Sequence, residues 1–131
     1  MEEHIERILK AAKCGNADAQ NKLGVIYANG QGVPQDHAQA AAWYQKAAEQ
    51  GNAWAQNNLG VMYQNGSGVP QDHAQAAAWY RKAAEQGNEL AKNNLDAMSQ
   101  EDRDVPQDED SRHRRTEAEL ASRQSTQQRL I

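Results

Sequence analysis

The stretch Gly32 to Asn52, GVPQDHAQAAAWYQKAAEQGN, decides the fold because it occurs twice in the chain. It returns at Gly68 to Asn88, 36 residues later, with one change, from Gln45 to Arg81. Self-similarity at a period of about 20–50 residues is typical of solenoids, in which each unit buries its apolar face only against its neighbours. The repetition therefore predicts an all-α solenoid of antiparallel helix pairs.

The composition limits the classes of function. A length of 131 residues fits one domain, and a net charge of −4 with a pI near 5.5 argues against a general nucleic-acid or anionic-membrane binder. The single cysteine, Cys14, excludes an intrachain disulfide. Residues 1–7 are acidic and lack a long apolar run, so they resemble neither a secretory signal nor a membrane span. We expect a cytoplasmic protein with no nucleic-acid and no membrane partner, unless a leader has been removed.

Outside the duplicated stretch, the chain divides into three parts. Residues 2–14 read as an amphipathic helix that aligns with the second helix of the later units, so it belongs to a unit whose first half is missing. Its apolar stripe consists of Ile5, Ile8, Leu9, Ala11 and Ala12. We expect a capping helix in residues 1–15, the repeats in residues 16–100 and a charged, degenerate segment in residues 101–131. The repeats comprise units near 17–52 and 53–88 and a partial third unit from residue 89.

Each unit begins after a very short turn. In Gly51-Asn52, glycine closes one helix in the left-handed conformation and asparagine caps the next, as Gly15-Asn16 and Gly87-Asn88 also do. The first helix of a unit, about Ala17 to Ala28, buries the face that contains Ala19, Leu23 and Tyr27. Glycine in its interior, at positions 24 and 60, costs about 1 kcal/mol relative to alanine, which suggests that a neighbouring group approaches closely there.

The second helix of each unit follows a loop with two glycines and a Val-Pro pair. Asp36 is expected to cap this helix, which extends over His37 to Glu49, with Gln39 completing a variant capping box. Its inward-facing stripe consists of Ala40, Trp43, Tyr44, Ala47 and Ala48.

The two full units share the pattern AxxxLGxxYxxGxGVxxDxxxAxxWYxKAAEQG, from Ala19 to Gly51 and again from Ala55 to Gly87. This pattern resembles the Sel1-like repeat, a relative of the tetratricopeptide repeat with a longer interhelix loop, and the resemblance covers roughly residues 5–98. It implies a right-handed superhelix whose first helices line a concave face, and adaptor or scaffold roles in bacteria and eukaryotes. Some cysteine-rich bacterial relatives lock each repeat with a disulfide, for which this chain lacks the cysteines.

The third unit departs from the pattern. Asp96 takes the place of Gly60, and residues 101–104, EDRD, replace both loop glycines. Residues 109–131 are rich in charge, glutamine and serine, so a polar helix over about 108–124 and disorder are both compatible with the sequence. The basic residues 112–115 are flanked by acids, which favours a solvated charged segment over a nucleic-acid contact.

The predicted binding surface is the face of the first helices opposite their core stripe. If the first helices line the concave side, this face carries the residues that we expect to contact a partner: Trp54, Asn57, Val61, Gln64, Asn21, Val25, Leu90 and Asn93. Trp54 is the expected anchor, since large aromatic side chains dominate many interfaces. The stacked asparagines are expected to hydrogen-bond an extended peptide. The alternatives are that the asparagines form a solvated face and that Trp54 folds onto its neighbour.

The sequence offers no catalytic, cofactor or metal constellation. The Trp-Tyr pairs at residues 43–44 and 79–80 have the helical phase of core residues rather than of a ligand box. His37 and His73 are expected to lie one repeat apart, about 10 Å, whereas zinc bonds to nitrogen are about 2 Å long. The glycines at residues 30–32 lack the GxxxxGK[ST] phosphate-loop motif. We therefore expect a protein that is not an enzyme and carries no metal or cofactor.

Two functional classes follow from these observations. The leading hypothesis is a non-catalytic interaction module that binds a peptide or partner protein on its concave face. The alternative is a structural scaffold that self-associates through a poorly capped C-terminal end, after Met98. A hydrolase, an activity ascribed to some cysteine-rich relatives, is least favoured because the chain lacks their cysteines and an acid–base pair.

Overall fold

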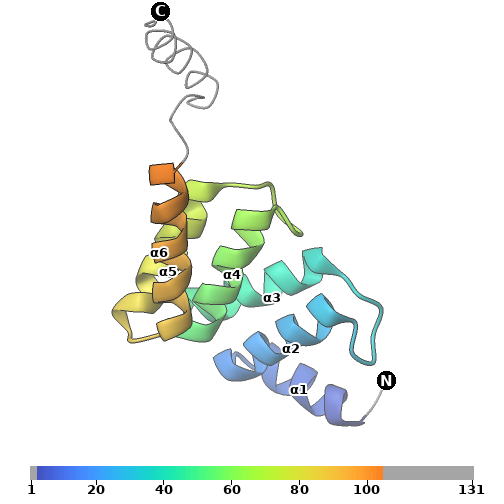
Figure 1. Cartoon of the computed structure of the whole chain (residues 1–131). Coiled ribbons are helices and arrows are strands. Elements are labelled where there is room, and N and C mark those ends of the chain that lie inside the picture. Colours follow the sequence, from blue (N-terminus) through green and yellow to red (C-terminus); the bar gives the residue numbers. More distant parts are fainter. Residues whose placement is uncertain (1–2, 105–131) are drawn as a thin grey trace, which may run out of the picture. The chain divides into compact units, whose positions relative to one another are not determined.

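The computed structural model of the protein describes residues 3–104, which contain six α-helices and no strand (Figure 1). The chain divides into two compact units, Met1–Leu95 and Asp96–Ile131. The helices are α1 (Glu3–Lys13), α2 (Ala17–Asn29), α3 (His37–Glu49), α4 (Ala53–Asn65), α5 (His73–Glu85) and α6 (Glu89–Asp104). The predicted all-α architecture of helix pairs is confirmed for the described residues, while the expected polar helix at about 108–124 lies outside them.

The short turns between units have the predicted conformation. At the turn before α4, Gly51 has a φ of 95° and the Asn52 Oδ1 atom accepts the backbone N–H of Ala55 at 2.9 Å. The equivalent glycines and asparagines at the turns before α2 and α6 behave in the same way. A left-handed glycine followed directly by a capping asparagine ends one helix and starts the next. Consecutive helices therefore fold back on one another.

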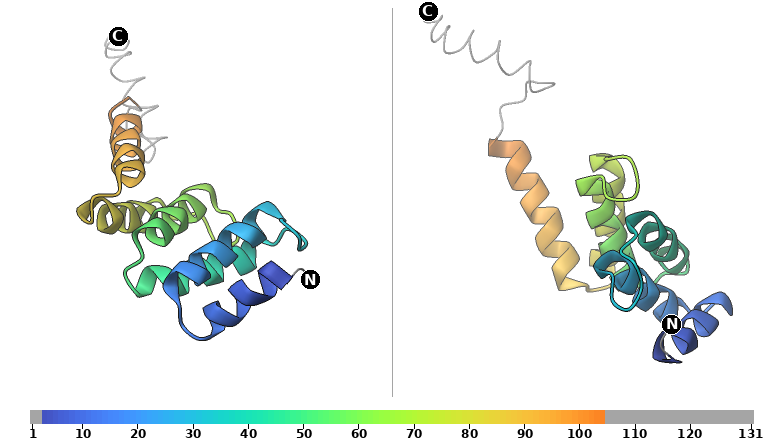
Figure 2. Two further views of the ribbon diagram at one scale, coloured as in Figure 1. Left: turned by 90° about the horizontal axis from the view of Figure 1, so that it is seen from below. Right: turned by 90° about the vertical axis from the view of Figure 1, so that its right-hand side faces the viewer.

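Within α1 to α5, each helix packs against the next one in the sequence, as the two views in Figure 2 show. The buried apolar residues of α1 to α4 form two clusters. One cluster contains Ile5, Ala12, Ala19, Leu23 and Ile26. The other contains Ala40, Ala41, Tyr44, Ala47, Ala48, Ala55, Leu59 and Met62. The core is thus distributed along the solenoid, with contacts made between neighbours, as the repeat predicted.

The helical glycines lie against buried tyrosines. A Cβ atom added to Gly60 would lie 2.6 Å from the Cε1 atom of Tyr80, and one added to Gly24 would lie 2.5 Å from the ring of Tyr44. Both tyrosine rings are buried, with at most 5% of their surface exposed. The predicted close approach is confirmed, and its cause is a tyrosine ring packed directly on the backbone of the facing helix.

The second helices carry the Trp-Tyr pairs as structural residues. Burial raises the pKa of both Tyr44 and Tyr80 to about 12, because the charged tyrosinate form loses its hydration in the core. The tryptophans are partly buried and pack against the core clusters, and the Nζ atom of Lys82 lies 5.7 Å from the centroid of the Trp79 ring. These contacts confirm core packing for the pairs.

Buried glutamines connect successive units, a feature that the sequence analysis missed. The Nε2 atom of Gln86 donates to the Oε1 atom of Gln56 at 2.8 Å, and Gln56 in turn donates to the carbonyl of Ala48 at 3.1 Å. Gln50 and Gln20 form the same chain of hydrogen bonds one unit earlier. Gln20 and Gln56 are 5% and 4% exposed, so these hydrogen bonds satisfy the two buried amides, while Gln50 and Gln86 are exposed.

Helix α6 is longer than the other first helices of the repeats. Helices α2 and α4 each have 13 residues and end at a left-handed glycine, Gly30 or Gly66, with φ of 68° or 71°. In α6 the equivalent position is Asp102, and the helix continues to Asp104, giving 16 residues. Without a glycine to adopt the left-handed conformation, the helix continues past the position at which α2 and α4 end.

Candidate protein-binding surface

The most exposed large apolar side chains in the described residues occupy one repeat position. Trp54 is 58% exposed and Leu90 is 48% exposed, and each is the second residue of its helix, α4 or α6. Both follow a capping asparagine and a single helical residue, so the turn fixes the position from which their side chains project. A protein of this size does not gain stability from leaving an indole in water, which makes this pair a candidate contact surface.

Trp54 and Leu90 line one shallow pocket of about 380 Å³. Its remaining lining residues are Ala53, Gln86, Gly87, Asn88 and Glu89. We call this set of seven residues the Trp54 surface. It combines two exposed apolar side chains with polar residues from the turn between α5 and α6.

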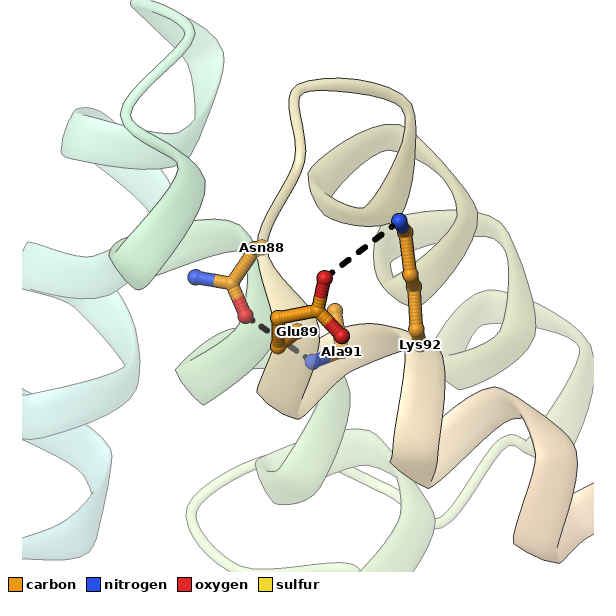
Figure 3. Close-up of polar contacts among 4 residues, drawn as sticks. All are labelled: Asn88, Glu89, Ala91 and Lys92. Atoms are coloured by element: carbon orange, nitrogen blue, oxygen red, sulfur yellow. Dashed lines mark hydrogen bonds and ion pairs between the residues drawn. The ribbon is translucent and has the colours of Figure 1, made fainter.

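The polar side of the Trp54 surface is set by the start of α6 (Figure 3). The Asn88 Oδ1 atom accepts the backbone N–H of Ala91 at 2.8 Å, which holds the turn in place. The Glu89 carboxylate lies 3.6 Å from the Nζ atom of Lys92, and the Glu89 side chain is 80% exposed while that of Lys92 is 48% exposed. An exposed ion pair of this kind contributes little to stability, so both charges remain available to a partner.

The corresponding position of the preceding unit has different chemistry. Asp18 stands where Trp54 and Leu90 stand, and its Oδ1 atom accepts a hydrogen bond from the Asn52 side chain at 2.8 Å. An indole or an alkyl group cannot accept such a bond. The exposed apolar character is therefore confined to the second and third units.

The structure corrects the expectation for the asparagine row. Asn57 is 1% exposed, and its Oδ1 atom accepts a hydrogen bond from the Asn94 side chain at 2.9 Å. Asn58 donates in the same way to Asn21 at 3.0 Å. A buried, paired Asn57 is unable to bind an extended peptide. The helical phase alone predicts an exposed Asn57, but the packing of one first helix on the next buries it. Of Asn21, Asn57 and Asn93, only Asn93 is exposed.

The remaining predicted residues are partly buried. Val61 and Gln64 are intermediate in exposure, and the Gln64 Oε1 atom accepts the Tyr80 hydroxyl at 2.6 Å. Val25 packs in part against the core and, with Asn21, lines a separate cavity near α1. The structure therefore brings Trp54 and Leu90 together, but it does not join all eight predicted residues in one site. Gln86 and Asn88 were missed because sequence reasoning assigned them only to the turn.

Among the described residues there is no group of three or more His, Cys, Asp or Glu side chains that could hold a metal ion. None of the helices in residues 3–104 has the length and apolarity needed to cross a membrane. The surface is suited to noncovalent recognition through one aromatic anchor, one aliphatic side chain and nearby amides.

Comparison with known proteins identifies the repeat. The Sel1 repeat model matches residues 17–52 and 55–88. Among solved structures, the chain is similar to a Sel1 repeat protein from Oxalobacter formigenes, with 44% identity, coverage of 71% of this chain and 70% of that chain, and a TM-score of 0.69. It is also similar to Helicobacter pylori cysteine rich protein B, with 28% identity, coverage of 72% and 73%, and a TM-score of 0.67.

A further similar structure is c5321, a protective antigen present in uropathogenic Escherichia coli strains displaying an SLR fold. Its identity to this chain is 36%, its TM-score is 0.52, and the match covers 66% of this chain but only 26% of c5321. Comparison with curated protein sequences gives no match. The two matched repeats span more than half of the 131 residues and coincide with the helix pairs α2–α3 and α4–α5. The chain therefore belongs to the Sel1 repeat family.

Proposed function

We propose that this protein is a non-catalytic adaptor that binds a segment of a partner protein on the Trp54 surface. Sel1 repeat proteins are generally protein–protein interaction modules, which supports this class of function. The observation that carries the proposal is the exposed pair of Trp54 and Leu90 beside one pocket. Aromatic residues at the centre of an interface provide most of the binding free energy in many complexes.

The chemistry of the surface suggests the kind of segment that binds. Trp54 and Leu90 offer apolar area, while the side chains of Gln86 and Asn88 border the same pocket. A segment with one bulky apolar side chain flanked by exposed backbone groups matches both features. The net charge of −4 supports a protein partner over nucleic acid or an anionic membrane. The single cysteine supports a reducing compartment, so we propose the cytoplasm as its location.

The test compares partner capture by the wild-type chain, Trp54→Ala and a control variant, Gln75→Ala. Gln75 is an exposed residue of α5 outside the Trp54 surface. Partners captured from a bacterial lysate by wild type and by Gln75→Ala are expected to be depleted with Trp54→Ala. Equal recovery of every partner by all three proteins would contradict the proposal that partners bind at the Trp54 surface.

Self-association through the C-terminal end is the alternative role. It rests on the decay of the repeat pattern after Leu95, where Asp96 replaces the glycine of the earlier units. Sedimentation velocity across a range of protein concentrations distinguishes the two roles. The adaptor proposal predicts a monomer at all concentrations, whereas a scaffold shifts to larger species as the concentration rises.

A further inference from the structure

Helix α2, the first helix of its repeat, contacts two other helices, α3 and α4. Helix α2 contacts α3 where Gly24 meets the ring of Tyr44. It contacts α4 where the Asn21 side chain accepts a hydrogen bond from Asn58 at 3.0 Å. The groove between α3 and α4 is therefore a seat for a helix, and α2 occupies it.

Helices α1 and α2 form an equivalent groove one unit earlier. They precede α3 and α4 by 36 residues, and the same hydrogen bond joins each pair of helices. Gln20 donates to the carbonyl of Ala12 at 3.0 Å, as Gln56 donates to that of Ala48 at 3.1 Å. Within residues 3–104 no helix occupies this groove, which we call the α1–α2 groove.

Residues that line the α1–α2 groove are more exposed than the equivalent residues of α3. Two adjoining cavities, of about 400 and 220 Å³, share His4, Ile8 and Lys22 among their lining residues. His4 is exposed, whereas Ala40, at the same position of α3, is fully buried. Ile8 is partly exposed, whereas Tyr44, at the equivalent position of α3, is buried. Val25 and Ile26 complete the apolar floor of the smaller cavity.

The charge of the groove indicates what it binds. Arg7 stands at the position of Trp43, and Lys22 stands at the position of Asn58, so the groove gains two cations in a chain of net charge −4. The Arg7 guanidinium lies 3.6 Å from the Glu3 carboxylate, but both side chains are more than 70% exposed, and such pairs are weak. The one lining carboxylate, Asp18, already accepts a hydrogen bond from Asn52.

We propose that the α1–α2 groove binds an acidic amphipathic α-helix of a partner protein. The inference does not depend on the Trp54 surface, which lies on other residues. By equivalence with α2 in its own seat, the bound helix places a small residue, like Gly24, over Ile8. Three residues before it, at the position of Asn21, an acidic side chain faces Lys22. These two positions lie on the same face of a helix.

The test uses a helical peptide built from the sequence of α2. The probe is residues Ala17–Asn29 with Asn21→Glu, held helical by a staple on its outer face, and the control probe carries Asn21→Lys instead. Fluorescence anisotropy with the full chain is expected to give about fivefold to tenfold tighter binding for the acidic probe. In the Lys22→Glu variant the order of the two affinities is expected to reverse.

Two further variants separate this site from other surfaces. Ile8→Asp is expected to weaken the acidic probe by more than about tenfold, because it places a charge beneath the bound helix. Trp54→Ala is expected to leave that affinity unchanged. If Ile8→Asp fails to fold by circular dichroism, the reversal in Lys22→Glu decides alone.

Three results would overturn the proposal. The first is equal affinity for the acidic and basic probes, and the second is binding that does not respond to Lys22→Glu. The third is self-association of the chain that Ile8→Asp disperses, because the occupant of the groove is then a second copy of the chain rather than an acidic helix of another protein.

Discussion

At the scale of single residues, the contact between glycine and tyrosine sets the distance between paired helices. Gly60 lies against Tyr80, and Gly24 lies against Tyr44, with no space for a Cβ atom. Glycine costs about 1 kcal/mol of helix stability in such a position, so its use is explained only by the close packing that it permits. The sequence predicted the close approach from the recurrence of the glycine, but not which side chain fills the space.

Gly60→Ala is predicted to lower the free energy of unfolding by about 1–2 kcal/mol. Overpacking against Tyr80 costs about 1–3 kcal/mol, and the better helix propensity of alanine offsets at most about 1 kcal/mol of that loss. Urea denaturation measures the difference. The control is Ala78→Gly, at an exposed position of α5, which reports the propensity difference alone. A stabilised Gly60→Ala variant would contradict the packing explanation.

The buried tyrosines predict a loss of stability at high pH. The pKa of Tyr44 and Tyr80 is about 12 in the folded protein, against 10.0 for an unperturbed tyrosine. Between these values the unfolded chain releases protons that the folded chain retains, so the free energy of unfolding falls as the pH rises from about 10 to 12. The stabilisation is fully present below pH 10, and each tyrosine contributes at most about 2–3 kcal/mol to the decline.

Urea titrations at pH 9 and pH 11.5 measure this decline. The informative comparison is with Tyr44→Phe, which keeps the ring and removes the hydroxyl. That variant is expected to show a smaller decline between the two pH values than the wild type. An identical decline in both proteins would indicate that Tyr44 does not titrate with the raised pKa.

At the scale of helices, the hydrogen bonds between glutamines of successive units were not predictable from the repeat sequence. Gln56 lies inside the solenoid, where it links Gln86 to the carbonyl of Ala48. Its recurrence at 20 and 56, together with glutamine at 50 and 86, was visible in the sequence. A polar residue at a helical surface position is usually solvated, however, and only the packing of the next unit buries this one.

Gln56→Ala is predicted to lower the free energy of unfolding by about 1–3 kcal/mol. The substitution removes two hydrogen bonds, and each contributes about 0.5–1.5 kcal/mol. Thermal and urea denaturation check the value against Gln75→Ala, at an exposed position of α5, where a change within about 0.5 kcal/mol is expected. Equal stability of the two variants would show that the buried amides contribute nothing measurable.

The helices α2 to α5 were predictable because their boundaries have local chemical signals. Glycine and asparagine mark the turns, and Asp36 caps α3 by accepting the backbone N–H of Gln39 at 3.0 Å. The binding surface was less predictable, because its exposure depends on how successive units stack. The helical phase correctly predicted that Trp54 is exposed, whereas it also predicted an exposed Asn57, which is buried.

At the scale of the whole molecule, the second helices of the two full repeats are nearly identical, whereas the first helices differ in sequence. The second helices, α3 and α5, differ by one residue and perform the same packing role. The second residue of the first helix differs between the units: it is Asp18 in α2, Trp54 in α4 and Leu90 in α6. The exposed apolar surface is formed by Trp54 and Leu90. A solenoid permits this variation because each unit depends only on its neighbours for its core.

The central claim, that the Trp54 surface binds the partner, is tested most directly by one affinity measurement. Isothermal titration calorimetry of a captured partner compares the wild type with Trp54→Ala, with Gln75→Ala as the control. We predict that Trp54→Ala raises Kd by about 30-fold or more, the loss expected for an anchor worth about 2 kcal/mol, while Gln75→Ala leaves Kd unchanged. An unchanged Kd for Trp54→Ala would contradict the account.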